Sequence, residues 1–295
     1  MARKIAICVG QNDYAPHTQV PPLRGCVNDV LLIGEMLRVA GFDIIRQIHN
    51  EAATQKGILD RLSSEIAKLR AGDQLVFWNS SHGYQVQDRS GDELVDGLDE
   101  AICTYDTDSR DPLTDDKFAK IFSRIHPEAF VFFASDSCHS ATLSRTLQGN
   151  HTSKNHPEDR RPRLWTPPDD VFFRSGRPTI NLGKYVAGFK KPIGKRKTRR
   201  LGLLHRKENI NHLFLSGCKA DEVSWDAKFD QGYHGAMTYH FAMTVLNSWE
   251  NKKPITYQKA FNLAVKGIKK AKYDQNPQLE GPTKLSNQYV FGFKP

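Results

Sequence analysis

Short apolar runs alternate along the chain with stretches in which apolar residues recur every three or four positions. The runs predict β-strands and the recurring positions predict amphipathic helices. Strands are expected over 4–10, 42–48, 74–79, 129–135, 212–216 and 288–293. Helices are expected over 26–40, 54–69, 114–125, 234–247 and 257–270. Strand alternating with helix predicts an α/β domain with right-handed crossovers between parallel strands.

This periodicity is lost between residues 144 and 207. The segment holds 17 Lys and Arg against four Asp and Glu, a local excess of 13 positive charges in a chain whose net charge is +9. We therefore expect one domain over 1–295, made of a first part (1–143), a basic insertion (144–207) and a last part (208–295). The insertion is open to several interpretations: a solvated loop, a surface for nucleic acid or an acidic partner, or a nuclear-localisation signal.

Composition narrows the class of protein. Hydrophobic residues make up 39% of the chain, which is enough for a sizeable core and excludes wholesale disorder. Five cysteines, none in a CxxC pair, argue against a disulfide scaffold or a zinc ribbon and favour a reducing compartment. The start of the chain lacks the apolar stretch of a signal peptide, and no run is long enough for a membrane span. We expect a cytoplasmic protein without a membrane partner, or a nuclear one if the host is eukaryotic.

Two predicted strands end in residues that can carry chemistry. The strand over 74–79 is followed by His82 and Gly83, and the strand over 129–135 is followed by Asp136 and Cys138. Alone, such a Cys is usually a small buried residue and a His before Gly usually marks a turn. Ligands of α/β sheets gather beyond the carboxyl ends of the strands, so both together favour a thiol nucleophile with an imidazole base.

The surrounding residues resemble those of metacaspases. Ser80-Ser81-His82-Gly83 is similar to the Ser-Gly-His-Gly box of that family, with Ser81 in place of the first Gly, and Asp136-Ser137-Cys138-His139-Ser140 matches the Asp-x-Cys-His-Ser box. Further similar segments are Leu23–Asp29, Asp96–Glu100, Thr114–Asp116, Leu215–Lys219, Gly235–Tyr239 and Gln275–Leu279. The resemblance spans nearly the whole chain except the basic insertion.

The resemblance implies a caspase-like fold with a mostly parallel six-stranded sheet flanked by helices. It also implies a cysteine endopeptidase that cleaves peptide bonds after Arg or Lys. Cys138 would be the nucleophile and His82 the base, and the amides of Gly83 and Cys138 would form the oxyanion hole. The alternative is a catalytically silent scaffold, or an adaptor that binds nucleic acid or an acidic partner through the insertion.

The resemblance places four residues in the pocket for the side chain before the scissile bond. They are Asp29, Asp136, Ser80 and Cys26. A cationic side chain entering a desolvated pocket needs an opposite charge, which the two carboxylates would supply. The competing interpretation is that Asp29 caps a helix and Asp136 satisfies a turn.

Calcium is a second feature that the resemblance raises. Asp99, Asp115 and Asp116 match three of the family's ligands, but Arg145 stands where the fourth is expected. A guanidinium cannot ligate a cation. We expect calcium to be unnecessary or weakly bound.

The basic insertion lies where this family is commonly processed. If the pocket takes Arg or Lys, then Arg161, Arg163, Lys197 and Arg200 are candidate self-cleavage sites.

Overall fold

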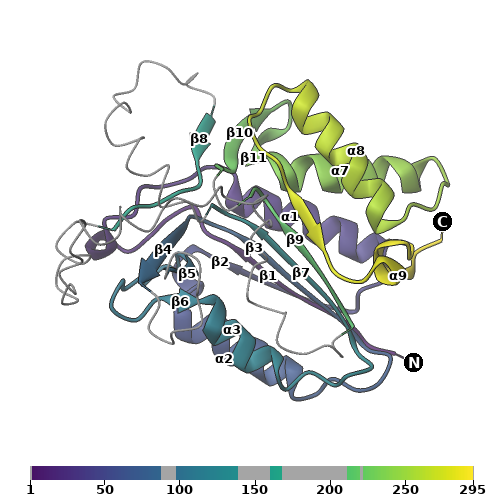
Figure 1. Ribbon diagram of the computed structural model, residues 1–295, viewed down its shortest axis with the longest axis horizontal. Coiled ribbons are helices and arrows are strands. Elements are labelled where there is room, and N and C mark those ends of the chain that lie inside the picture. Colours follow the sequence, from purple (N-terminus) through teal and green to yellow (C-terminus); the bar gives the residue numbers. More distant parts are fainter. Residues whose placement is uncertain (1, 88–97, 139–159, 168–210, 220–221, 295) are drawn as a thin grey trace, which may run out of the picture.

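The computed structural model describes residues 2–87, 98–138, 160–167, 211–219 and 222–294 (Figure 1). Its centre is a six-stranded sheet of order β12-β9-β7-β3-β1-β2. These strands are β1 (Lys4–Gly10), β2 (Ile44–His49), β3 (Gln74–Ser80), β7 (Phe130–Asp136), β9 (His212–Ser216) and β12 (Gln278–Glu280). All neighbours pair in parallel except β12 with β9. The predicted mostly parallel α/β fold is confirmed.

Helices cover both faces of this sheet (Figure 1). One face carries α1 (Cys26–Val39), α7 (Ala236–Glu250) and α8 (Tyr257–Lys270), and the other carries α2 (Gln55–Ile66) and α3 (Asp115–Phe122). Side chains of a strand alternate between the two faces, so Ala6 and Cys8 pack in the first core while Ile5 and Ile7 pack in the second. A sheet covered on both faces explains why its strands read as continuous apolar runs.

Two small antiparallel sheets were not predicted. One consists of β4 (Gly83–Gln87), β5 (Leu98–Ile102) and β6 (Leu113–Thr114), and the other of β8 (Arg160–Pro162), β10 (Trp225–Phe229) and β11 (Gly232–Gly235). β4 begins three residues after the end of β3, and β8 belongs to the basic insertion. Both sheets lie toward the carboxyl ends of the parallel strands, where a site is expected (Figure 1).

The predicted C-terminal strand over 288–293 is wrong. This segment contains a short 3₁₀ turn, η4 (Val290–Gly292), in which Val290 and Phe291 are buried and Phe291 has a φ of 53°. The Phe291 ring packs edge-on against Phe42 and Phe132, so the apolar residues cover the end of the core. The edge strand is β12 instead.

The remaining elements are short: η1 (Pro16–Thr18), η2 (Asn50–Ala52) and α9 (Thr283–Ser286). Most of the predicted helix and strand bounds differ from the observed ones by a few residues. The helix predicted over 234–247 begins at Ala236, because 232–235 belong to β11. None of the described helices has the length and hydropathy needed to cross a bilayer.

Candidate functional site

Two neighbouring strands of the sheet end side by side and lead into His82 and Cys138. Ser80, the last residue of β3, pairs with Asp136, the last residue of β7. His82 and Cys138 each follow two residues later and are both buried. Because β3 and β7 are parallel and in register, the two residues leave the same edge of the sheet from adjacent strands.

The imidazole of His82 is held by a backbone carbonyl. Its Nε2 atom lies 2.9 Å from the carbonyl oxygen of Pro21, a contact that requires the proton on Nε2. The His82 amide donates to the Tyr14 hydroxyl at 3.0 Å, which positions the backbone. Burial lowers the pKa of His82 to about 3, and the charge of Arg163 acts in the same direction, against the Pro21 carbonyl. The ring is therefore neutral at pH 7, and its basic nitrogen is Nδ1, a buried atom with no hydrogen-bond partner among the described residues.

Cys138 contacts two different segments. Its amide donates to the carbonyl oxygen of Arg163 at 3.2 Å. Its Sγ accepts a hydrogen bond from the Ser224 amide at 2.6 Å and lies 3.3 Å from the Ser224 carbonyl oxygen. In the part of the chain that is described, no hydrogen bond joins this thiol to His82.

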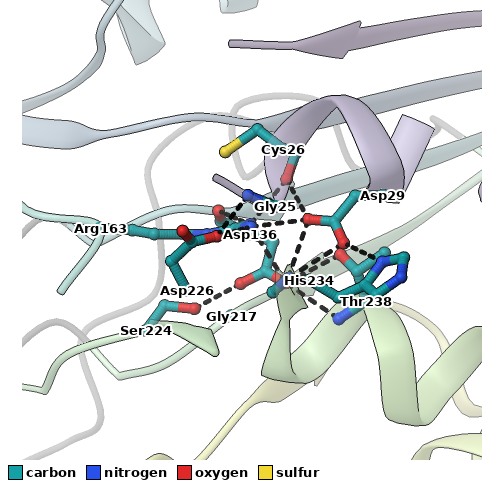
Figure 2. Close-up of polar contacts among 12 residues, drawn as sticks. Gly25, Cys26, Asp29, Asp136, Arg163, Gly217, Ser224, Asp226, His234 and Thr238 are labelled. Atoms are coloured by element: carbon teal, nitrogen blue, oxygen red, sulfur yellow. Dashed lines mark hydrogen bonds and ion pairs between the residues drawn. The ribbon is translucent and has the colours of Figure 1, made fainter. Parts of the chain in front are cut away.

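A buried arginine from the basic insertion lies beside this pair. The side chain of Arg163 has no exposed area, and its Nη2 donates to Asp29 at 2.8 Å and to Asp226 at 2.9 Å. Its Nη1 donates to the Ser80 hydroxyl at 2.6 Å and to the Asp136 carbonyl at 3.1 Å, with the Asp136 carboxylate 3.6 Å away. Figure 2 shows the guanidinium group among carboxylates that come from β10, α1 and β7.

The carboxylates of Asp29 and Asp226 are held in place by further donors. The Gly235 amide donates to both oxygens of Asp29, at 3.0 and 3.1 Å, and Nδ1 of His234 lies 3.1 Å from Asp29. Asp226 accepts from the amide of Arg24 at 2.8 Å and from the amide of Gly25, which Figure 2 labels, at 3.0 Å. The oxygens of both carboxylates thus have hydrogen-bond donors within the buried site.

Asp136 is held by a different set of donors. Its carboxylate accepts from the Ser224 hydroxyl and, at 2.9 and 2.8 Å, from the amide and hydroxyl of Thr238. Burial raises the pKa of Asp136, while the Arg163 charge opposes that shift and the nearby Asp29 charge adds to it. Three carboxyl groups thus surround the one guanidinium group.

The backbone around Arg163 runs through the site as an extended strand, which we call the inserted strand (residues 160–165). Its first half, β8, pairs antiparallel with β10. The carbonyl oxygen of Arg163 accepts from the amides of Gly83 at 3.0 Å and Cys138 at 3.2 Å. The Trp165 amide then donates to the Gly83 carbonyl at 3.0 Å. The inserted strand thus contacts the body of the protein on both sides of the Arg163 carbonyl group.

Comparisons with known proteins identify the family. The family model described as "Caspase domain" matches residues 3–287 of the chain. The chain belongs to the caspase domain family. Similar curated proteins are a metacaspase-1 of Meyerozyma guilliermondii, 29% identical over 94% of this chain and 69% of that protein, and a metacaspase-1 of Candida albicans, 26% identical over 98% and 67%. A metacaspase-8 of Arabidopsis thaliana is 36% identical over 50% of this chain and 39% of that protein.

A solved structure shares the fold. The crystal structure of a Geobacter sulfurreducens protein matches with a TM-score of 0.67 and 24% identity, covering 99% of this chain and 100% of that one. The family match and the metacaspase relatives make this chain a caspase-like cysteine peptidase, and therefore a hydrolase. The chain spans about two thirds of the length of the fungal metacaspases that it matches.

Most of the residues predicted for the peptidase site lie together. Asp29, Asp136 and Ser80 contact the Arg163 guanidinium. Cys26 makes no hydrogen bond to the guanidinium; burial raises the pKa of its thiol, and the charge of Arg163 opposes that shift. The interpretation that Asp29 only caps a helix does not account for its contact with Arg163.

The candidate self-cleavage residues differ in their placement. Arg163 is buried in the site, whereas the guanidinium of Arg161 is exposed and donates to the Pro22 carbonyl at 3.2 Å. Lys197 and Arg200 lie outside the described residues.

Sequence reasoning missed Asp226, His234, Ser224 and Pro21. Asp226 and His234 are isolated polar residues in short strands without periodicity. Pro21 acts through its backbone carbonyl, which leaves no side-chain signal, and Ser224 is an isolated serine that acts through its backbone and its hydroxyl. Only the pairing of β10 with β8 and β11 brings Asp226 and His234 to the pocket.

The residues predicted to bind calcium lie at one end of β5 and the start of α3. Asp99 and Asp115 are buried and Asp116 is partly exposed, while Arg145 lies outside the described residues. Within the described ranges, no group of three or more Asp, Glu, His or Cys side chains is arranged to hold a metal ion. We therefore derive no catalytic step through a metal.

Proposed function

We propose that this caspase-like peptidase is an endopeptidase that cleaves after Arg or Lys, with Cys138 as nucleophile and His82 as base. One observation carries the proposal. The side chain of Arg163 lies among three carboxylates while its carbonyl oxygen accepts hydrogen bonds from the amides of Gly83 and Cys138. A substrate whose scissile bond follows a basic residue would need the same two contacts at once.

The charge of the pocket supports basic specificity. When Arg163 is absent, Asp29, Asp136 and Asp226 would remain buried without a cation, and uncompensated buried charge is costly. Another cationic side chain is therefore favoured, and an acidic one is repelled. The two terminal nitrogens of Arg163 contact different acceptors, whereas a Lys ammonium offers only one nitrogen. We expect Arg to be preferred over Lys.

The proposed reaction is acyl transfer. The Nδ1 atom of His82 accepts the thiol proton, while the Pro21 carbonyl holds the Nε2 proton and so fixes the tautomer. Sγ of Cys138 attacks the carbonyl carbon, and the negative charge that develops on its oxygen is stabilised by the Gly83 and Cys138 amides. The protonated imidazole then gives its proton to the departing amine, and water hydrolyses the thioester.

The thiol must move before it can attack. Sγ now accepts a hydrogen bond from the Ser224 amide, and rotation about the Cα–Cβ bond of Cys138 would bring it toward His82 and the Arg163 carbonyl. We propose that the bond between Arg163 and Leu164 is the self-cleavage site among the described candidates.

Fluorogenic peptides that end in Arg, Lys or Asp before the leaving group test the specificity. We expect hydrolysis of the Arg peptide above the Lys peptide and none of the Asp peptide, with Cys138→Ala and His82→Ala inactive. Hydrolysis of the Asp peptide, or activity that survives in Cys138→Ala, would contradict the proposal.

Mass spectrometry tests the self-cleavage site. Wild-type protein incubated at concentrations at which it is active on peptides should release fragments that end at Arg163, and Cys138→Ala should stay intact. Arg161, whose guanidinium contacts the Pro22 carbonyl and not the carboxylates, offers a matched control, because Arg161→Gln should leave this cleavage unchanged. Fragments that end only at other basic residues would show that Arg163 is not cut.

We also propose that calcium is not required for hydrolysis. The support is the guanidinium of Arg145, which stands where the resemblance expects a fourth ligand. Activity on the Arg peptide should be the same in EGTA as in millimolar calcium. Loss of activity in EGTA that calcium restores would overturn this.

We also propose that the protein works in a reducing compartment such as the cytoplasm. All five cysteines are free and buried, which supports this proposal.

A further inference from the structure

We infer that the protein has an apolar subsite on the leaving-group side of the scissile bond, which takes an aromatic side chain two positions after that bond. The inference rests on the proposed function and extends it from the residue before the cleaved bond to a residue after it. Trp165 of the inserted strand occupies this subsite in the structure.

Trp165 is nearly buried, with 7% of its surface exposed. Its ring lies 5.0 Å from the Tyr84 ring, measured between centroids, at an interplanar angle of 75°, an edge-to-face contact that favours aromatic partners. Around this contact lies a cluster of apolar and aromatic side chains. It consists of Val20, Tyr84, Ala101 and Cys103, with Tyr14 and Val86 packed against them.

The position of Trp165 follows from backbone pairing rather than from its side chain alone. Gly83 donates its amide to the Arg163 carbonyl, and its own carbonyl accepts from the Trp165 amide at 3.0 Å. Leu164 therefore pairs with Gly83 as a parallel bridge. Gly83, whose amide contributes to the proposed oxyanion hole, thus also holds the second residue after the scissile bond, here Trp165, over the lining. Any peptide bound in this register would place its side chain there.

The lining belongs to the body of the protein, not to the insertion. Tyr84 and Val86 lie on β4, Ala101 on β5, and Val20 follows η1. When the inserted strand leaves after cleavage, this apolar surface would be exposed to water unless a substrate covers it. A charged side chain at that position would lose water against these apolar side chains, at a cost in free energy that an apolar side chain does not carry. An aromatic residue is the best match in shape and polarity.

The test uses the Trp165→Ala variant, in which the side chain that fills the subsite has been removed. The substrates are internally quenched peptides with the sequence Arg-Arg-Pro-Arg-Leu-X, where X is Trp, Ala or Asp. We expect kcat/KM to be about tenfold or more higher for Trp than for Ala, and lowest for Asp. Equal values for Trp and Ala would overturn the inference.

Filling the subsite provides a second, independent measurement. Val20→Phe in the Trp165→Ala background should reduce the ratio of kcat/KM for Trp over Ala toward one. Leu263→Phe is a matched control. Leu263 is 41% exposed and lies on α8, outside the subsite, so this substitution should leave the ratio unchanged. A ratio that Val20→Phe leaves intact would show that the aromatic side chain binds elsewhere.

Failure of the subsite can be told from failure of the peptidase proposal. A peptide whose fluorogenic group directly follows Arg has no residue on the leaving-group side, so its hydrolysis tests the peptidase alone. If it is cleaved and the Trp and Ala peptides are equivalent, only the subsite is refuted. If nothing is cleaved, binding of the same peptides to Cys138→Ala/Arg163→Gln/Trp165→Ala, in which the inserted strand no longer holds the pocket, is measured by fluorescence anisotropy: equal affinities overturn the subsite and about tenfold tighter binding of Trp supports it.

Discussion

Arg163 and Asp226 form a buried ion pair in which Nη2 lies 2.9 Å from Oδ1 and neither side chain has exposed area. Arg163 belongs to the basic insertion and Asp226 to β10, in the last part of the chain. The pair joins the inserted strand to the body at a carboxylate that also accepts from the amides of Arg24 and Gly25. Breaking a buried pair leaves a charge without compensation, so this contact favours the occupied state of the pocket.

Asp226→Asn should lower kcat/KM for Arg peptides by roughly 10- to 100-fold, because a hydrogen bond to a charged group contributes about 1.5–3 kcal/mol. The amide keeps the shape of the side chain, so the fold should persist. Asp230→Asn, at an exposed position in the next turn, is the matched control and should be close to wild type. An unchanged kcat/KM in Asp226→Asn would show that Asp226 does not contribute to binding the substrate's basic side chain.

Gly235→Ala should abolish hydrolysis of Arg peptides. A Cβ atom at this position would clash with Oδ2 of Asp136 and with Nη1 of Arg163, so any side chain fills the space of the guanidinium. The release of the inserted strand should be detectable as faster trypsin cleavage after Arg163. Retained activity with a normal melting temperature would mean that substrates bind by another route.

Arg163→Gln should vacate the pocket in the intact chain. We expect no cleavage at the bond to Leu164 and a several-fold higher initial rate on short Arg peptides, because the inserted strand no longer competes for the carboxylates. The melting temperature should fall at neutral pH, since three carboxylates lose their cation. Arg161→Gln, which removes an exposed guanidinium, should change neither rate nor melting temperature. An initial rate in Arg163→Gln no higher than that of wild type would show that Arg163 does not block the site.

The stability of the intact protein should fall on acidification through His82. Its pKa is about 3 in the folded state and 6.5 in the unfolded state, so between pH 6.5 and pH 3 the unfolded chain takes up this proton and the folded chain does not. The loss between pH 7 and pH 5 should be about 2 kcal/mol from this residue. Urea unfolding of wild type and His82→Gln at both pH values measures it as the difference between the two proteins. The same pH dependence in both would contradict a buried neutral imidazole.

The succession of strands and helices along the chain could be predicted, because each of these elements follows from the pattern of neighbouring residues. The strand over 4–10 and the helix over 257–270 match β1 and α8 in full, since apolar runs and helical spacing are properties of neighbouring residues. The segment over 288–293 shows the limit of such patterns. Its apolar residues predict a strand, but their burial against Phe42 and Phe132 requires a turn.

The sequence by itself determined the α/β class, the two strand ends that carry His82 and Cys138, and the charges of Asp29 and Asp136. These features follow from residue type and from spacing within short segments. The tertiary structure alone decided that Arg163 lies among the carboxylates, that Asp226 completes them, and that Trp165 packs on Tyr84. The physical reason is that these contacts join residues between 27 and 134 positions apart, and only strand pairing and burial bring such residues together.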